Sequence, residues 1–232
     1  MTLQIDFVSD VACPWCAVGL NALERALERL GEAVPVEIRF QPFELNPQMG
    51  SEGADTVDYL SRKYGITPAQ IAQNQAVIRE RGAAVGFAFG ARPRVWNTFD
   101  AHRLLAWAAT QGLAPQRALK HALLRAYHGQ GRNPGAREVL LEAAAEAGLD
   151  ADAAAAVLDS QAHADDVREA EAFWQGVGIQ SVPSVVINRR HLIQGGQPPE
   201  VFEQALRRLA NEAPALEPNG VGGGTSQTDR AE

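Results

Sequence analysis

Two cysteines stand three residues apart in the sequence Cys13-Pro14-Trp15-Cys16, and the chain has no others. Residues at positions i and i+3 of a helix lie on the same side, so these thiols are within reach of one disulfide. Pro14 suits the first turn of a helix, where a backbone N–H has no partner. We expect Trp15 to cover the pair from the other side. The spacing therefore predicts thiol–disulfide chemistry.

The first thiol has the better position for ionisation. The unpaired N–H groups and the dipole of a helix N-terminus stabilise an anion. Cysteines in such positions have pKa values of roughly 3.5–7.5, against about 8.5 for a free thiol. We expect Cys13 to be the exposed attacking thiolate and Cys16, one turn into the helix, to resolve the mixed disulfide.

A zinc site is the alternative interpretation of a Cys-x-x-Cys pair. Its two further ligands would have to come from the five histidines, and no two of these have the spacing of a zinc ligand pair. The sequence therefore favours a redox pair and predicts neither a metal site nor a resident cofactor.

The flanking residues predict that the pair lies between a strand and a helix. Apolar and polar residues alternate over residues 3–8, as in a half-buried strand. From Pro14 the leucines recur every three or four residues, and Gly31 is a typical helix stop. Residues 36–40 form a second expected strand, so the helical connection predicts a parallel β-α-β unit.

After Phe43 no convincing strand is predicted for more than a hundred residues, and helix signals dominate. Asp55 can cap one helix, and Thr67 with Gln70 forms a capping box for the next. Further helices are expected from Asn97 or Thr98, from Pro115, over 139–147 and over 150–160. We expect residues 44–165 to form an all-helical insertion subdomain.

Strand character returns at residues 182–187 and 191–194, which we expect to form a hairpin. A last helix follows Pro198-Pro199. Beyond residue 213 the chain is rich in Gly, Pro, Ser and Thr, so residues 214–232 are expected to be a disordered tail. Residues 1–43 and 166–213 would then form one discontinuous domain.

Pro183 opens a strand in a chain that begins with strand, Cys-x-x-Cys and helix. An isolated X–Pro bond is cis in only about 5–6% of cases. Here, however, a helix, a Val-Pro strand start, a hairpin and a closing helix follow in the order of a thioredoxin fold. The expected class is therefore α/β, a thioredoxin-like fold with a large all-helical insertion.

Four motifs in sequence order resemble the FrnE-like branch of the DsbA family over nearly all of residues 3–211. They are Val8-Ser9-Asp10 with the Cys-Pro-Trp-Cys motif and Gly19, Asn97-Thr98 with Ala101-His102-Arg103-Leu104, Gly178 with Val182-Pro183, and Gly195-Gly196-Gln197-Pro198. The resemblance implies a cis Val182–Pro183 bond packed against the dithiol. It also implies disulfide exchange with protein clients or with small thiols such as glutathione. The Val182 backbone would pair with an extended substrate.

Two features depart from the family pattern. DsbA-type oxidants have a histidine between the cysteines, whereas this chain has Trp15 and no Lys or Arg nearby in the sequence. A very low pKa of Cys13 is therefore not expected. A third cysteine is absent, which excludes a relay through a second dithiol.

Two other functions remain alternatives. Kappa-class glutathione transferases and 2-hydroxychromene-2-carboxylate isomerases belong to the same superfamily and have a serine in place of Cys13. Their glutathione contacts resemble the regions of Asn97 and Val182. A chaperone-like binding module is the third interpretation, which a large exposed apolar patch would support.

Two further polar residues are candidates near the dithiol. Asp10 could take up protons during exchange, or it could cap the loop before the helix. His102 could face the dithiol cleft, or it could be a buried, hydrogen-bonded histidine.

Charge and hydropathy exclude several classes of partner. The chain has 21 Lys and Arg against 28 Asp and Glu, and no segment concentrates the basic residues. This balance disfavours nucleic acid and anionic membranes. No run approaches the roughly 18 apolar residues of a membrane span. The first residues lack a basic start and include Asp6, so we expect no signal peptide and a cytoplasmic location.

Overall fold

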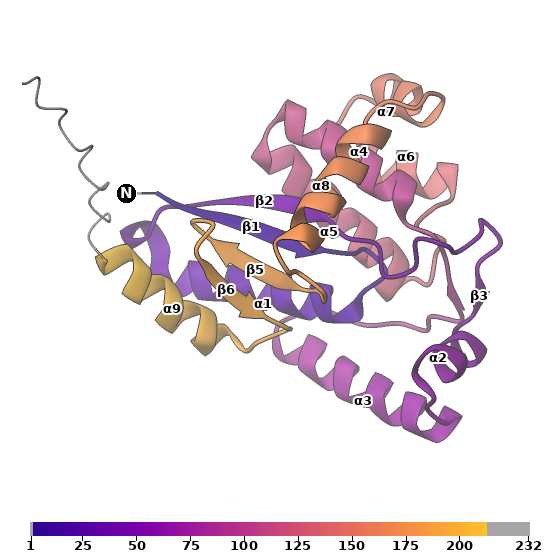
Figure 1. Cartoon of the computed structure of the whole chain (residues 1–232), viewed down its shortest axis with the longest axis horizontal. Coiled ribbons are helices and arrows are strands. Elements are labelled where there is room, and N and C mark those ends of the chain that lie inside the picture. Colours follow the sequence, from indigo (N-terminus) through magenta and orange to yellow (C-terminus); the bar gives the residue numbers. More distant parts are fainter. Residues whose placement is uncertain (1, 213–232) are drawn as a thin grey trace, which may run out of the picture.

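A four-stranded mixed sheet organises the protein in the computed structural model, which describes residues 2–212 (Figure 1). The central strand β1 (Leu3–Ser9) pairs in parallel with β2 (Val36–Pro42) and antiparallel with β5 (Ser184–Ile187). Strand β6 (His191–Gln194) pairs antiparallel with β5 and completes the order β2-β1-β5-β6. The predicted β-α-β unit and hairpin are both confirmed.

Helices cover both faces of this sheet. Helix α1 (Pro14–Leu30) connects β1 to β2 and ends at Gly31, whose φ of 55° suits glycine. It packs beside α9 (Pro199–Asn211) on the face that Phe7 points to. Helix α8 (Ala164–Gly176) covers the other face, where Trp174 packs with Val8. The alternation of β1 side chains thus builds two apolar cores.

The segment between β2 and β5 contains two helical groups, which Figure 1 shows on separate sides of the sheet. Helices α2 (Thr56–Tyr64) and α3 (Pro68–Ala84) pack against each other, and α3 also packs on α1. The second group is a bundle of α4 (Phe99–Gln111), α5 (Leu113–Leu124), α6 (Arg137–Glu146) and α7 (Ala151–Leu158). The short elements η1 (Gly31–Ala33), a 3₁₀ turn, and η2 (Arg125–Gly129), a π-helical turn, extend α1 and α5.

Local signals set several of these boundaries. The Asp55 carboxylate caps α2 by accepting hydrogen bonds from the N–H groups of Val57 and Asp58. The predicted capping box of Thr67 and Gln70 is present at the start of α3. These side chains satisfy N–H groups that the first helical turn leaves unpaired.

Three expectations about elements are wrong in detail. Two-residue strands β3 (Ala54–Asp55) and β4 (Arg94–Val95) pair within the segment expected to be all helical. Gly53 permits this pairing, because its φ is 63° and a Cβ there would lie 2.3 Å from the Val95 oxygen. Helix α5 begins at Leu113, two residues before Pro115, and α8 occupies a stretch for which no helix was placed.

The expected tail at residues 214–232 lies outside the described residues. The boundaries expected for the domain and its insertion therefore stay predictions. Within residues 2–212, no helix combines the length and the apolar character needed to cross a membrane.

Candidate active site

Cys13 is the N-cap residue of α1, with extended backbone angles, and Pro14 occupies the first helical turn as predicted. The Cys13 thiol donates a hydrogen bond to the Val182 carbonyl oxygen at 3.5 Å. The predicted cis bond between Val182 and Pro183 is confirmed, and Pro183 is buried. Gly19 of α1 allows Pro183 to pack closely against this helix, because a Cβ at Gly19 would lie 3.1 Å from Pro183 Cγ. The dithiol and the proline thus form one packed unit.

Cys13 is the more acidic of the two thiols, as its position at the helix N-terminus predicts. A hydrogen bond from the Cys16 thiol and the N–H groups of Cys16 and Trp15 lower the pKa of Cys13, against burial and the charge of Asp10. Burial raises the pKa of Cys16 well above its usual range, and the negative charge on Cys13 adds to this. Neither cysteine is in a disulfide. Cys13 is only 4% exposed, so the expectation of an exposed thiolate is wrong.

Side chains from the helical segments fix the loop that leads to Cys13. His128 of η2 donates from Nε2 to the Val11 carbonyl at 2.8 Å and accepts from Arg92 at Nδ1. Arg92 also donates to the Ala12 carbonyl at 3.4 Å. Burial and the charge of Arg92 lower the pKa of His128 far below its usual value. His128 is therefore a neutral, fully used hydrogen-bonding group.

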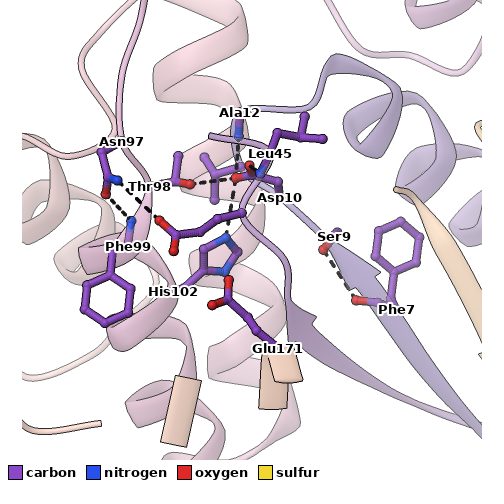
Figure 2. Close-up of polar contacts among 12 residues, drawn as sticks. Phe7, Ser9, Asp10, Ala12, Leu45, Asn97, Thr98, Phe99, His102 and Glu171 are labelled. Carbon is purple, nitrogen blue, oxygen red and sulfur yellow. Dashed lines mark hydrogen bonds and ion pairs between the residues drawn. The ribbon is translucent and has the colours of Figure 1, made fainter. Parts of the chain in front are cut away.

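Asp10 is the centre of a second buried network below this loop, as Figure 2 shows. Its carboxylate accepts hydrogen bonds from the N–H groups of Ala12 at 2.9 Å and Leu45 at 2.7 Å. It also accepts one from the Thr98 hydroxyl at 2.7 Å and faces His102 Nε2 at 3.4 Å. Burial alone would raise the pKa of Asp10, but His102 and the two N–H groups lower it below the usual value. These contacts agree with the interpretation of Asp10 as a residue that caps the loop before α1.

The other two polar candidates lie away from the thiol cleft. His102 lies between Asp10 and Glu171, whose carboxylate points toward the imidazole ring in Figure 2. Asn97 donates to Glu44 at 3.3 Å and accepts from the N–H of Phe99 at 2.7 Å. The structure thus uses Asn97 to hold the start of α4, and it places neither residue beside Cys13.

A cleft of about 820 Å³ opens next to Cys13. Its wall includes four of the predicted residues, Cys13, Pro14, Trp15 and Val182, whereas Pro183 and Cys16 do not line it. Helices α2 and α3 supply much of the opposite side. Further lining residues are Phe43, Leu45, Tyr59, Lys63, Tyr64, Ile71, Val77, Arg92 and Tyr127. The cleft is mostly apolar, and its charged lining residues are Lys63, Arg92 and Glu44.

Sequence reasoning did not identify several residues of this site. Lys63 of α2, Arg92 just before β4 and Tyr127 of η2 reach the cleft only through the packing of the chain, and no motif marks them. Lys120 is completely buried in α5. Gln116 and Lys120 are two buried polar residues one turn apart on this helix, and the sequence pattern did not mark either of them. In the described part of the chain no group of three or more His, Cys, Asp or Glu side chains could hold a metal ion.

Comparison with known proteins supports the same fold. The model of the DSBA-like thioredoxin domain family matches residues 4–207. The chain belongs to this family. It is 34% identical to the probable DsbA oxidoreductase SCO1869 of Streptomyces coelicolor, with a TM-score of 0.84 over 94% of this chain and 97% of the other. The resemblance inferred from the four motifs is thereby confirmed.

Two solved structures of lower sequence identity share the fold. A 2-hydroxychromene-2-carboxylate isomerase has 18% identity and a TM-score of 0.66, with 89% of this chain and 95% of that one covered. The cytosolic disulfide reductase DsbM of Pseudomonas aeruginosa, in a structure with GSH, has 18% identity and a TM-score of 0.61, with coverage of 89% and 98%.

Proposed function

We propose that this chain is a thiol–disulfide oxidoreductase in which Cys13 is the nucleophile and Cys16 the resolving thiol. The observation that carries the proposal is the placement of Cys13. It combines a lowered pKa at a helix N-terminus with a position on the wall of the 820 Å³ cleft, beside the Val182 carbonyl. Cys16 is fully buried one turn away and has a raised pKa. Of the two thiols, Cys13 is therefore the more acidic and the one that lines the cleft.

The exchange has two steps. The Cys13 thiolate attacks one sulfur of a substrate disulfide, a mixed disulfide forms and the other substrate sulfur leaves as a thiolate. Cys16 then loses its proton and attacks Cys13 Sγ, which closes the Cys13–Cys16 disulfide and releases the second substrate sulfur. Two electrons pass from the protein dithiol to the substrate, and the reverse sequence oxidises a substrate dithiol. The cysteine pair carries these electrons, so the proposal needs no resident cofactor.

The substrates we propose are disulfide-containing or dithiol proteins, glutathione, or both. An extended chain in the cleft could pair with the backbone at Val182, as a strand pairs with a sheet edge. The apolar wall would receive its side chains, and Lys63 and Arg92 would favour a carboxylate. A cytoplasmic location is part of the proposal, and the structural neighbour DsbM is described as a cytosolic enzyme.

Trapping with single cysteine variants tests the roles. Cys16→Ser should accumulate covalent mixed disulfides with a disulfide-containing client, because nothing resolves them, whereas the matched variant Cys13→Ser should trap nothing. Non-reducing gels after incubation with the client show both results. Equal trapping by the two variants contradicts the assignment. Retained function without either cysteine would support the binding-module alternative.

A glutathione-dependent transferase or isomerase is the second candidate, because the isomerase and the GSH-bound DsbM share this fold. The serine expected in the transferases and isomerases is replaced here by Cys13, with Cys16 behind it, which favours exchange. Comparing Pro183→Ala with the wild type separates the two candidates. A loss of exchange with a protein client supports the oxidoreductase, and a loss confined to glutathione disulfide supports the second candidate.

A further inference from the structure

Arg92 lies on the wall of the cleft next to Cys13, and three contacts hold it there. Its Nη1 atom donates to the Ala12 carbonyl at 3.4 Å and to His128 Nδ1 at 3.1 Å, and its guanidinium lies 5.4 Å from the centre of the Tyr127 ring. Ala12 directly precedes Cys13, although it is 80 positions from Arg92 in the sequence. The fold therefore supplies, beside the dithiol, the cation that the neighbouring sequence lacks.

These contacts use only part of the guanidinium. An arginine has five N–H donors, and the Ala12 and His128 contacts take the two hydrogens of Nη1. Within the described residues, Nε and Nη2 have neither a hydrogen-bond partner nor a carboxylate partner. Neither belongs to the buried unpaired atoms, so both are open to solvent. Together they form an edge that can bond one carboxylate through two parallel hydrogen bonds.

The cleft around this edge carries an excess of positive charge. Lys63 of α2 donates to the Leu45 carbonyl at 2.8 Å and to Asn46 Oδ1 at 2.7 Å, and the described chain gives it no carboxylate partner. The acidic residue of the cleft wall, Glu44, is ion-paired with Arg168, and its side chain is only 2% exposed. The protein as a whole has a net charge of −7. A positive cleft on a negative protein favours an anionic group.

The free edge also lies close to the nucleophile. Arg92 bonds the residue before Cys13, and it lines the main cleft together with Cys13. On its other side it lines a smaller hollow of about 320 Å³, which shares Pro14, the residue after Cys13, with the main cleft. A carboxylate bound by Arg92 is therefore near the substrate sulfur that Cys13 attacks.

We propose that Arg92 is a substrate-binding residue that favours disulfides with a carboxylate a few bonds from the sulfur. The inference rests on the proposed thiol–disulfide exchange and names its substrate class. The carboxylate accepts hydrogen bonds from Nε and Nη2 while Cys13 attacks the disulfide. A neutral disulfide lacks this contact, and a cationic one is repelled. The carboxylate belongs either to a small acidic disulfide or to an acidic side chain beside a cystine in a polypeptide.

Three small disulfides that differ in charge test the proposal. They are 3,3′-dithiodipropionate, bis(2-hydroxyethyl) disulfide and cystamine, which are anionic, neutral and cationic. Acid quenching and alkylation of the remaining thiols give the second-order rate at which each oxidises the reduced protein. Each rate is divided by that of the same disulfide with free dithiothreitol. The wild type should prefer the anionic to the neutral disulfide by about tenfold, as for a charge-assisted pair at a half-buried site.

Variants assign the preference to Arg92. In Arg92→Gln the ratio of the anionic to the neutral rate should fall by about tenfold, because the charged fork is lost. Arg92→Lys keeps the charge without the fork and should lose about threefold. Arg94→Gln is the matched control, since Arg94 is exposed, donates to the Glu52 carbonyl at 2.7 Å and does not line the cleft. Its ratio should stay within about twofold of the wild type.

The ratio separates recognition from support of the loop. If the glutamine variant only distorts the loop that Arg92 holds, all three disulfides slow together and the ratio does not change. Two cyclic disulfide peptides, with glutamate or glutamine beside each cysteine, are compared in the same way. A loss confined to the glutamate peptide means that the carboxylate belongs to a polypeptide. A loss with dithiodipropionate means that a small acidic disulfide is sufficient.

Unchanged ratios in Arg92→Gln with both the small disulfides and the peptides would overturn the inference and leave the proposed function intact. If this variant does not fold, the wild type provides the test. Its preference for the anion should shrink between about 0.01 M and 1 M salt, as the Debye length falls from about 30 Å to about 3 Å. No preference at low salt also overturns the inference. A reduced protein that none of these disulfides oxidises refutes the exchange function itself.

Discussion

Replacing Asp10 by asparagine tests whether the buried carboxylate holds the active-site loop. In its best orientation the amide oxygen keeps the contacts with Ala12, Thr98 and His102, which one carboxylate oxygen makes now. The amide NH₂ then faces the N–H of Leu45, whose partner is the other oxygen. An unpaired buried N–H costs about 1–3 kcal/mol, and the three remaining bonds lose their charge assistance. We expect a loss of about 3 kcal/mol in the free energy of unfolding.

Asp6→Asn is the matched control, at a buried aspartate of β1, the strand that ends just before Asp10. The Asp6 carboxylate accepts one bond, from Gln41 Nε2 at 2.6 Å, which an asparagine oxygen can still accept. Its loss should stay below about 1 kcal/mol. Urea unfolding of the reduced proteins at neutral pH measures both values. If the two variants have equal free energies of unfolding, the Asp10 carboxylate does not hold the active-site loop.

The dependence on pH gives a second check. The folded-state pKa of Asp10 is lowered, so its contribution is complete above the unfolded value of about 3.9 and is lost as pH falls toward the folded value. The difference between wild type and Asp10→Asn should therefore be constant from about pH 5 to pH 8 and shrink below about pH 4. If the difference in the free energy of unfolding grows as pH falls, the pKa of Asp10 is not lowered in the folded protein.

The same variant should make Cys13 more acidic. The negative charge of Asp10 raises the pKa of Cys13, and asparagine removes it. The midpoint of the alkylation rate of Cys13 against pH, with the site located by mass spectrometry, should move to lower pH. A shift to higher pH would mean that loop distortion outweighs the charge.

Two further predictions concern the support of the site. Gly90→Ala should lose about 2–3 kcal/mol in urea unfolding, because its Cβ would lie 2.1 Å from the Gly129 oxygen, whereas Gly50→Ala, with open space, should be neutral. Arg103→Lys should lose about 3 kcal/mol, since one ammonium cannot reach the carbonyls of Val157, Ser160 and Ala162 together, while the exposed Arg137→Lys should change stability by less than about 0.5 kcal/mol. If the two glycine variants lose the same free energy of unfolding, the close contact at Gly90 does not affect stability. If the two arginine variants do, the buried hydrogen bonds of Arg103 do not contribute to stability.

Elements with a local signal were predictable from the sequence. The leucine stripe and Gly31 define α1, and Thr67 with Gln70 defines the start of α3. The cis Val182–Pro183 bond was implied by the resemblance to the DsbA family, and the structure confirms it. In contrast, β3 and β4 are only two residues each, and they pair because Gly53 brings distant segments together. Two residues are too few for a hydrophobic period.

The polar part of the site was predictable only in outline. Cys13 and Cys16 are local, but the contact of Asp10 with His102 joins residues 92 positions apart. Lys120 has the same difficulty, because α5 packs against α4, α6 and β2 and therefore has buried positions on several sides. Its more exposed side carries Arg117 and His121, so the helix has basic residues both there and in its interior, and the sequence pattern does not show which of them is buried.

The order of the sheet has a consequence for synthesis of the chain. Strand β1 meets β2 after one helix, but its other neighbour β5 emerges about 140 residues after the end of β2. At about 5–20 residues per second, ribosomes take roughly 7–30 s to make this segment. During that interval the β5 side of β1 has no partner, while the cysteines have already been made and the insertion is being made. The nascent dithiol is therefore complete in sequence before Val182 exists to cover it.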